Sequence, residues 1–174
     1  MKRVLFTLLA IALLTMAAPS GFAQRNTRAT AKIVLSGKTV SVEYGRPSLK
    51  GRSVSDMLNQ LKPGDVWRLG ADKATTFSTP ADLQFGDATV PSGDYSLWAE
   101  READNSWKLV FNKQHGQWGT QHDAAQDLAS APLQQSEAAS PAEMVTITLT
   151  KAGKGAAITI QWGNLKLTAN FKLK

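Results

Sequence analysis

The feature that most constrains the fold is a strict alternation of two residues at the C-terminal end of the chain. Over residues 165–173, leucine, alanine and phenylalanine occupy the odd positions, and lysine, threonine and asparagine occupy the even ones. Side chains of a β-strand point to opposite faces in turn, so this pattern predicts a strand with one buried and one solvated face. The same period recurs over residues 39–44 and 107–112.

Glycine, proline and asparagine separate these segments at short intervals, which favours turns between strands. About nine short strands and one minor helix at 53–61 predict an all-β fold, either an antiparallel β-sandwich or a flattened barrel. We expect residues 31–174 to form a single domain. Within it, residues 113–142 are predicted to form a long surface loop, because this stretch is rich in alanine, glutamine and serine and contains two prolines.

The N-terminus has the features of a secretory signal peptide. Lys2 and Arg3 precede an almost uninterrupted apolar run over residues 4–18, and small residues stand three and one positions before the bond that follows Ala23. This pattern predicts cleavage between Ala23 and Gln24. The run is shorter than the ~20 residues that span a bilayer. We therefore expect a periplasmic or secreted protein without a membrane span after cleavage, in which residues 24–30 form a flexible lead-in.

Charge and cysteine content argue against several functional classes. Removal of the leader leaves 174 − 23 = 151 residues, enough for one domain with a sizeable core. Lys2 and Arg3 leave with it, so 20 − 2 = 18 basic residues face 14 acidic ones and the net charge is +4. A mild excess without a basic cluster makes nucleic acid a poor partner. The chain has no cysteine, which excludes disulfides, thiolate metal sites and cysteine nucleophiles.

Four motifs rich in glycine and polar residues follow one another along the chain. They read G-R-P-S-L-K-G-R at 45–52, V-W-R-L-G-A-D-K-A-T-T-F at 66–77, P-S-G-D-Y-S-L-W at 91–98 and F-N-K-Q-H-G-Q-W-G at 111–119. In this order they resemble the motifs of the bacterial DUF2911 family, exported proteins of unknown function. The resemblance spans roughly residues 31–173 and implies an exported β-rich domain, but no activity and no catalytic residues. The family usually has Asn-Glu where this chain has Asp72 and Lys73, so a base replaces an acid here.

Cationic and aromatic residues gather in the first two of these motifs. Guanidinium groups form planar, bidentate pairs with carboxylate or phosphate, and an indole offers a face for stacking. Such a cluster would bind a small anionic or saccharide ligand, or an envelope partner. The same arginines could instead pair with carboxylates of the protein, and Trp67 could be a core residue. The candidate ligand-binding residues are Arg46, Lys50, Arg52, Trp67, Arg68, Asp72, Thr75, Asn112 and Trp118.

The chain has two histidines, His115 and His122, both in the predicted loop. Either could act as a general base with a nearby acid, or bind a metal together with Asp123 or Asp127. The sequence has no H-E-x-x-H pattern and no G-x-S-x-G elbow. We therefore expect no metal site, no cofactor and no serine nucleophile. Solvated loop histidines are the simpler interpretation.

Three hypotheses for the function remain open. The preferred one is a non-enzymatic exported β-sandwich that binds its ligand near Arg46, Arg52, Trp67 and Arg68. The second is a hydrolase that uses one of the loop histidines with an acid, and two exposed histidines far from every carboxylate would remove it. The third is a purely structural envelope component, and a deep polar pocket would count against it.

Overall fold

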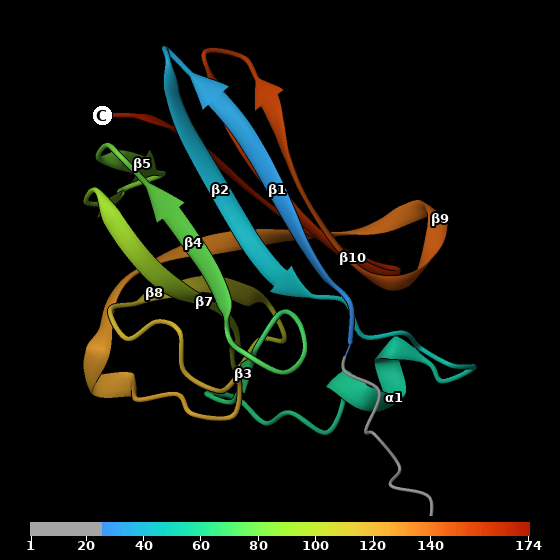
Figure 1. Cartoon of the computed structure of the whole chain (residues 1–174). Coiled ribbons are helices and arrows are strands. Elements are labelled where there is room, and N and C mark those ends of the chain that lie inside the picture. The colour runs from blue at the N-terminus through green and yellow to red at the C-terminus, as the bar shows by residue number, and fades with distance from the viewer. Residues whose placement is uncertain (1–25) are drawn as a thin grey trace, which may run out of the picture.

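The computed structural model describes residues 26–174, and the predicted signal peptide lies outside these residues. The described chain is built from antiparallel strands with one short α-helix and one 3₁₀ helix (Figure 1), which confirms the all-β prediction. In chain order the elements are β1 (Arg28–Leu35), β2 (Lys38–Gly45), α1 (Val54–Leu58), β3 (Val66–Trp67), β4 (Thr75–Thr79), β5 (Leu83–Phe85), β6 (Ala88–Val90), β7 (Gly93–Arg101), β8 (Trp107–Asn112), η1 (Ala124–Gln126), β9 (Asp127–Ala152) and β10 (Gly155–Leu173).

The ten strands belong to one hydrogen-bonded sheet. Nine of them follow the order β1-β2-β4-β7-β8-β9-β10-β5-β6, and the short β3 pairs with β7 outside this order. The sheet folds over along β9, because residues 127–133 of this strand pair with β8 whereas residues 134–152 pair with β10. The two halves of the sheet therefore face each other. Figure 1 shows the β1–β2 hairpin lying across β9 and β10. The predicted sandwich is thus made by one continuous sheet.

The core lies between the two halves of the sheet, and aromatic rings fill its centre. The ring of Phe77 in β4 lies 6.2 Å from Phe85, 5.4 Å from Phe111 and 6.4 Å from Phe171, measured between centroids. These partners come from β5, β8 and β10, so the core joins strands that are far apart in the sequence. In β10 the predicted alternation holds, since residues 167, 169 and 171 are buried and residue 170 is exposed.

The prediction of a long surface loop over residues 113–142 is wrong. The loop after β8 is followed at Ala124 by η1, and β9 begins at Asp127 and continues to Ala152. The composition of this stretch is poor in strand-forming residues. However, β8 and β10 pair with successive parts of it, and such pairing overrides a weak intrinsic preference because strand propensity depends strongly on context.

Two further boundaries differ from the prediction. β1 begins at Arg28, so the lead-in predicted for residues 24–30 includes the first residues of a strand. β10 continues through residues 163–164, although the Gly-Asn pair at these positions favours a turn between two strands. The register against β9 shifts on both sides of Gly163 instead. Gly163 has a φ of 54°, a conformation that glycine adopts without steric cost.

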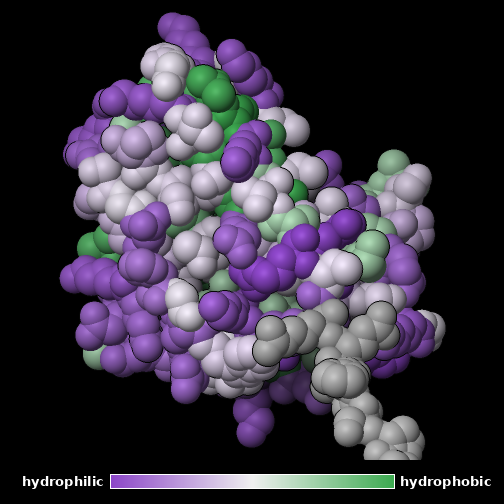
Figure 2. Space-filling model, viewed as in Figure 1, coloured by the Kyte–Doolittle hydropathy of each residue, from purple (hydrophilic) through white to green (hydrophobic). Residues whose placement is uncertain are grey.

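The surface viewed in Figure 2 is largely hydrophilic, with apolar side chains gathered near the tips of the β1–β2 and β9–β10 hairpins. Among the large apolar side chains of residues 26–174, Val34 and Trp118 stand out as exposed, with 54% and 49% of their surface accessible. None of the helices in this part of the chain is long and apolar enough to cross a membrane.

Candidate functional site

A cleft of about 620 Å³ lies between the loop after β2, helix α1, the segment 66–71 and the loop at 119–122. The basic side chains that line it are Lys50, Arg52 and Arg68. His122 also lines it, and no aspartate or glutamate among residues 26–174 does. The cleft is therefore a concave site with a positive lining, assembled from segments as far apart in the chain as Asn26 and Trp162.

Two glycines allow the two cationic motifs to meet at this cleft. A Cβ atom on Gly45 would lie 2.2 Å from the carbonyl oxygen of Ala71, and one on Gly70 would lie 2.9 Å from the carbonyl oxygen of Gly45. Such distances are shorter than van der Waals contact, so side chains at these positions would separate the two segments. The motifs 45–52 and 66–77 are in direct backbone contact as a result.

Arg46 anchors the first motif to β9 and does not line the cleft. Its Nε donates to the carbonyl oxygen of Val145 at 3.1 Å, and its Nη2 donates to Oγ1 of Thr146 at 3.2 Å. The neighbouring backbone is tied to the same strand, since Leu49 N donates to Glu143 O at 2.9 Å. Residues 143–145 of β9 have no register partner in β10. Their backbone groups are therefore available to this loop.

The three cations of the cleft are not paired with carboxylates of the described chain. The four ion pairs found among residues 26–174 involve Arg28, Lys108 and His122 on the basic side. Arg52 donates to the carbonyl oxygens of Leu49 and Ser48 at 2.9 and 3.2 Å. The half-buried side chain of Arg68 makes neither an ion pair nor a hydrogen bond among residues 26–174. Its guanidinium group is therefore the cation of the cleft with the most unused donors.

Trp67 belongs both to the core and to the wall of the cleft. Only 8% of its surface is accessible. Its ring stacks on Trp162 with centroids 5.8 Å apart and meets the edge of Trp107 at 6.4 Å. Trp162 also lines the cleft, and its indole Nε1 is buried without a hydrogen-bond acceptor among the described residues. The wall of the cleft thus includes two indole rings that also belong to the packed core.

The other candidates lie outside the cleft. The Oδ2 atom of Asp72 accepts a hydrogen bond from the backbone N–H of Asn26 at 3.1 Å. Thr75 is fully buried, and its hydroxyl donates to the carbonyl oxygen of Arg68 at 3.1 Å. Trp118 forms an isolated bridge with Lys73. These contacts hold the segment 68–75 and the loop beside it in shape, and in this way they support the cleft indirectly.

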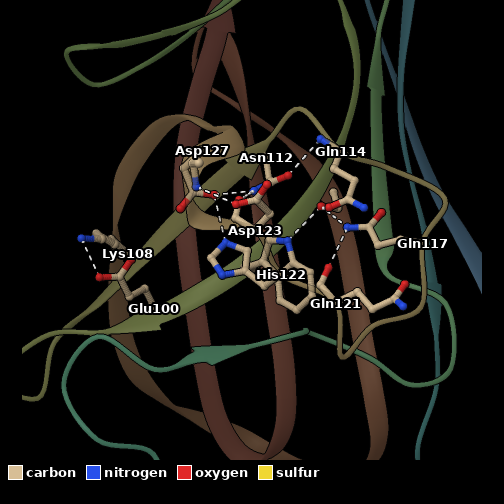
Figure 3. A network of polar contacts seen from close by, with 12 residues as sticks. Glu100, Lys108, Asn112, Gln114, Gln117, Gln121, His122, Asp123 and Asp127 are labelled. Atoms are coloured by element: carbon tan, nitrogen blue, oxygen red, sulfur yellow. Dashed lines mark hydrogen bonds and ion pairs between the residues drawn. The ribbon is translucent and has the colours of Figure 1, made fainter.

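Asn112 is also fully buried and holds an acidic side chain of β9 in place. Its Nδ2 group donates to Oδ1 of Asp127 at 2.7 Å and to the carbonyl oxygen of Asp123 at 2.8 Å. Its Oδ1 accepts from the backbone N–H of Gln114 at 2.9 Å. Figure 3 shows that these contacts gather the loop after β8 around one amide. The amide has no remaining donor for a ligand, since both of its N–H bonds have protein acceptors.

For His122, the interpretation as a solvated loop histidine is wrong. Its Nε2 lies 2.9 Å from Oδ1 of Asp127, and 15% of its side chain is accessible. The ring also packs against that of Trp98, with centroids 4.8 Å apart. His115 is exposed, as expected for a solvated loop histidine. No pattern in the sequence could have separated the two histidines, because the partners of His122 come from β7 and β9.

The family model for DUF2911, described as a protein of unknown function, matches residues 26–171. The chain belongs to the DUF2911 family. The match includes every residue that lines the cleft. Comparison with curated proteins and with solved structures finds no match. The residues described here contain no group of three or more histidine and acidic side chains arranged to hold a metal ion.

Glu143 provides a pH-dependent anchor for the cleft loop of this DUF2911 protein. The Ser48 hydroxyl and the backbone N–H of Lys50, the latter at 2.8 Å, hydrogen-bond to the Glu143 carboxylate and lower its pKa below the usual value of 4.5. Because the pKa of Glu143 is lower in the folded state than in the unfolded state, the ionised carboxylate stabilises the folded loop at pH values above the usual pKa. This contribution is lost as the pH falls through the folded-state pKa.

We expect the exchange protection of the Lys50 amide to fall between about pH 6 and about pH 3. Glu143→Gln should show the lower protection already at the higher pH. Unchanged protection in both experiments would contradict this role.

Proposed function

We propose that this protein binds a small organic anion in the cleft. The observation that carries the proposal is the composition of the lining, which combines Lys50, Arg52 and Arg68 with no acidic side chain from the described part of the chain. Guanidinium groups bind carboxylate and phosphate through two parallel hydrogen bonds. The volume of about 620 Å³ falls within the range of roughly 300–1,000 Å³ that is typical of small-molecule sites.

The rest of the lining indicates a ligand that carries a ring or an apolar group beside its charge. Met57, Leu58 and Leu61 line one part of the cleft, and the indoles of Trp67 and Trp162 line another. A saccharide with an acidic group and an aromatic acid both have this chemistry.

The cleft favours a binding role over a purely structural one. Three cations that share a cleft without carboxylates repel one another and destabilise the folded state. A bound anion would remove this repulsion. We propose that the protein meets its ligand in the periplasm or outside the cell, and this part of the proposal depends on the signal peptide predicted for residues 1–23.

Titration of the purified protein with glucuronate, benzoate, phosphate and neutral glucose tests the binding proposal. We expect glucuronate or benzoate to bind and to raise the melting temperature, and glucose to have no effect. Arg68→Ala should weaken anion binding by about 10-fold or more, because a hydrogen bond to a charged group contributes about 1.5–3 kcal/mol. The control is Lys154→Ala, in the exposed turn between β9 and β10, which should change the affinity less than about twofold. Equal binding of glucose and the anions, or unchanged affinity in Arg68→Ala, would refute the proposal.

A further inference from the structure

The imidazole of His122 is oriented by contacts on its edge and on its face. Its Nε2 lies 2.9 Å from Oδ1 of Asp127, and its ring packs on Trp98, of which 2% is exposed. A carboxylate can only accept a hydrogen bond, so Nε2 carries the hydrogen and Nδ1 of the neutral ring keeps its lone pair. Figure 3 shows the second ring nitrogen pointing away from Asp127. His122 therefore has a proton acceptor that Asp127 does not use.

The residues around His122 are themselves held by buried groups. Asn112 donates to the same Oδ1 atom of Asp127 at 2.7 Å. The indole N–H of Trp98 donates to the hydroxyl of Ser96 at 2.8 Å, and both Ser96 and Asn112 are fully buried. A histidine on a mobile surface loop has no such support. Supporting contacts of this kind are what keep a reactive side chain in one orientation.

The cation with unused donors lies next to the loop that carries His122. Gly119 packs so closely on Arg68 that a Cβ atom there would lie 2.8 Å from Cδ of the arginine. Arg68 and His122 line the same cleft. A proton acceptor and a guanidinium group on one cleft provide two elements of ester hydrolysis: one activates water and the other stabilises an oxyanion.

We infer that His122 is a general base, and that the cleft hydrolyses a carboxylic ester that carries a separate anionic group. The inference rests on the proposed anion binding, with Lys50 and Arg52 holding the anionic group. His122 Nδ1 takes a proton from water while the water oxygen forms a bond to the ester carbonyl carbon, and Arg68 stabilises the negative oxygen. The bond between this carbon and the alcohol oxygen then breaks, and His122 returns the proton to that oxygen. One ester and one water give one carboxylic acid and one alcohol.

Asp127 is a positioning residue in this scheme, because it acts through His122. If Asp127 orients the base, its substitution should have an effect that the loss of a merely structural contact would not have. Asp127→Asn should lower kcat more than it raises KM, and neutral His122 in this variant should no longer carry its hydrogen on Nε2 alone, as measured by NMR. A loss of structural support alone would not move the hydrogen between the two ring nitrogens.

Hydrolysis of the mono-para-nitrophenyl ester of adipic acid by the full protein tests the inference. We expect this ester to react faster than neutral para-nitrophenyl butyrate. His122→Gln should lower kcat/KM by about 100-fold or more, while the affinity for adipate, measured by calorimetry, stays within about twofold of the wild type. The matched control is His115→Gln, which changes the exposed histidine of the same loop and should leave the rate unchanged.

Two results would overturn the inference: no hydrolysis of the adipate ester above the buffer rate, or equal hydrolysis by wild type and His122→Gln. If adipate still binds to the wild type and not to Arg68→Ala, the proposed anion binding stands while the general base is refuted. If adipate does not bind at all and the ester is not hydrolysed, both proposals fail.

The proton–nitrogen NMR spectrum of the histidine rings of the wild type gives a second test that requires no variant to fold. We expect neutral His122 to carry its hydrogen on Nε2 alone and His115 to show a mixture of both forms, because Asp127 contacts only Nε2 of His122. A mixture at His122 would overturn the inference, because Asp127 would then not orient the base.

Discussion

Gly45→Ala is expected to destabilise the protein by about 3 kcal/mol or more, or to prevent folding. The new Cβ would lie 2.2 Å from the carbonyl oxygen of Ala71 and 3.0 Å from its carbonyl carbon and its nitrogen. All three atoms are backbone, so no side-chain rotation relieves the overlap. Either the end of β2 or the segment that carries Arg68 has to move. Urea denaturation would measure the loss in the free energy of unfolding.

Gly45→Ala should also weaken anion binding, because the same contact brings the two cationic motifs to the cleft. The control is Gly116→Ala. A Cβ on Gly116 meets no atom within 4 Å, but its φ is 80°. This variant should lose only about 1–2 kcal/mol, through backbone strain, and should keep its affinity for the anion. Equal losses of stability in the two variants would mean that the contact between Gly45 and Ala71 does not hold the motifs together.

Phe77→Ala is expected to lower the free energy of unfolding by about 3–5 kcal/mol, because it leaves a cavity in the core. Phe77 is fully buried, and its ring contacts Phe85, Phe111 and Phe171 across both halves of the sheet. In a domain of this size each kcal/mol corresponds to roughly 2–4 °C, so the melting temperature should fall by about 10 °C. Differential scanning calorimetry would measure the shift.

The residue Phe77 does not line the cleft, so the folded fraction of Phe77→Ala should bind the anion as the wild type does. Val34→Ala is the control, because 54% of Val34 is exposed and its truncation should change stability by less than about 0.5 kcal/mol. If Phe77→Ala loses less than about 1 kcal/mol, the two halves of the sheet do not share one packed core.

The strands that the sequence predicted well are those in which one face is buried along the whole length. β10 shows its alternation in the burial of residues 167–171, and the pairing of β8 begins at the predicted Trp107. The part of β9 before residue 143 was missed because residues 134–142 are exposed or half-buried, so they carry no alternation. This strand exists because its neighbours supply hydrogen bonds, and a single sequence does not contain that information.

The candidate site was predicted only in part, because the sequence does not show which distant residues a polar group will meet. Lys50, Arg52, Trp67 and Arg68 line the cleft, as the density of cationic and aromatic residues in their motifs suggested. Asn112, also proposed as a ligand-binding residue, has its amide groups bound by protein atoms. Composition identifies polar groups, but whether such a group meets a ligand or another part of the chain depends on burial and on partners that lie far away in the sequence.

The sequence by itself determined that this protein is an antiparallel β-fold, because the direction of side chains along a strand is a local property with a period of two. Only the tertiary structure decided which groups share the cleft. That outcome depends on the contact between Gly45 and Ala71, on the change of partner along β9 and on the pairing of His122 with Asp127. Each of these contacts joins separate segments, and the spacing of residues along the chain does not encode their meeting.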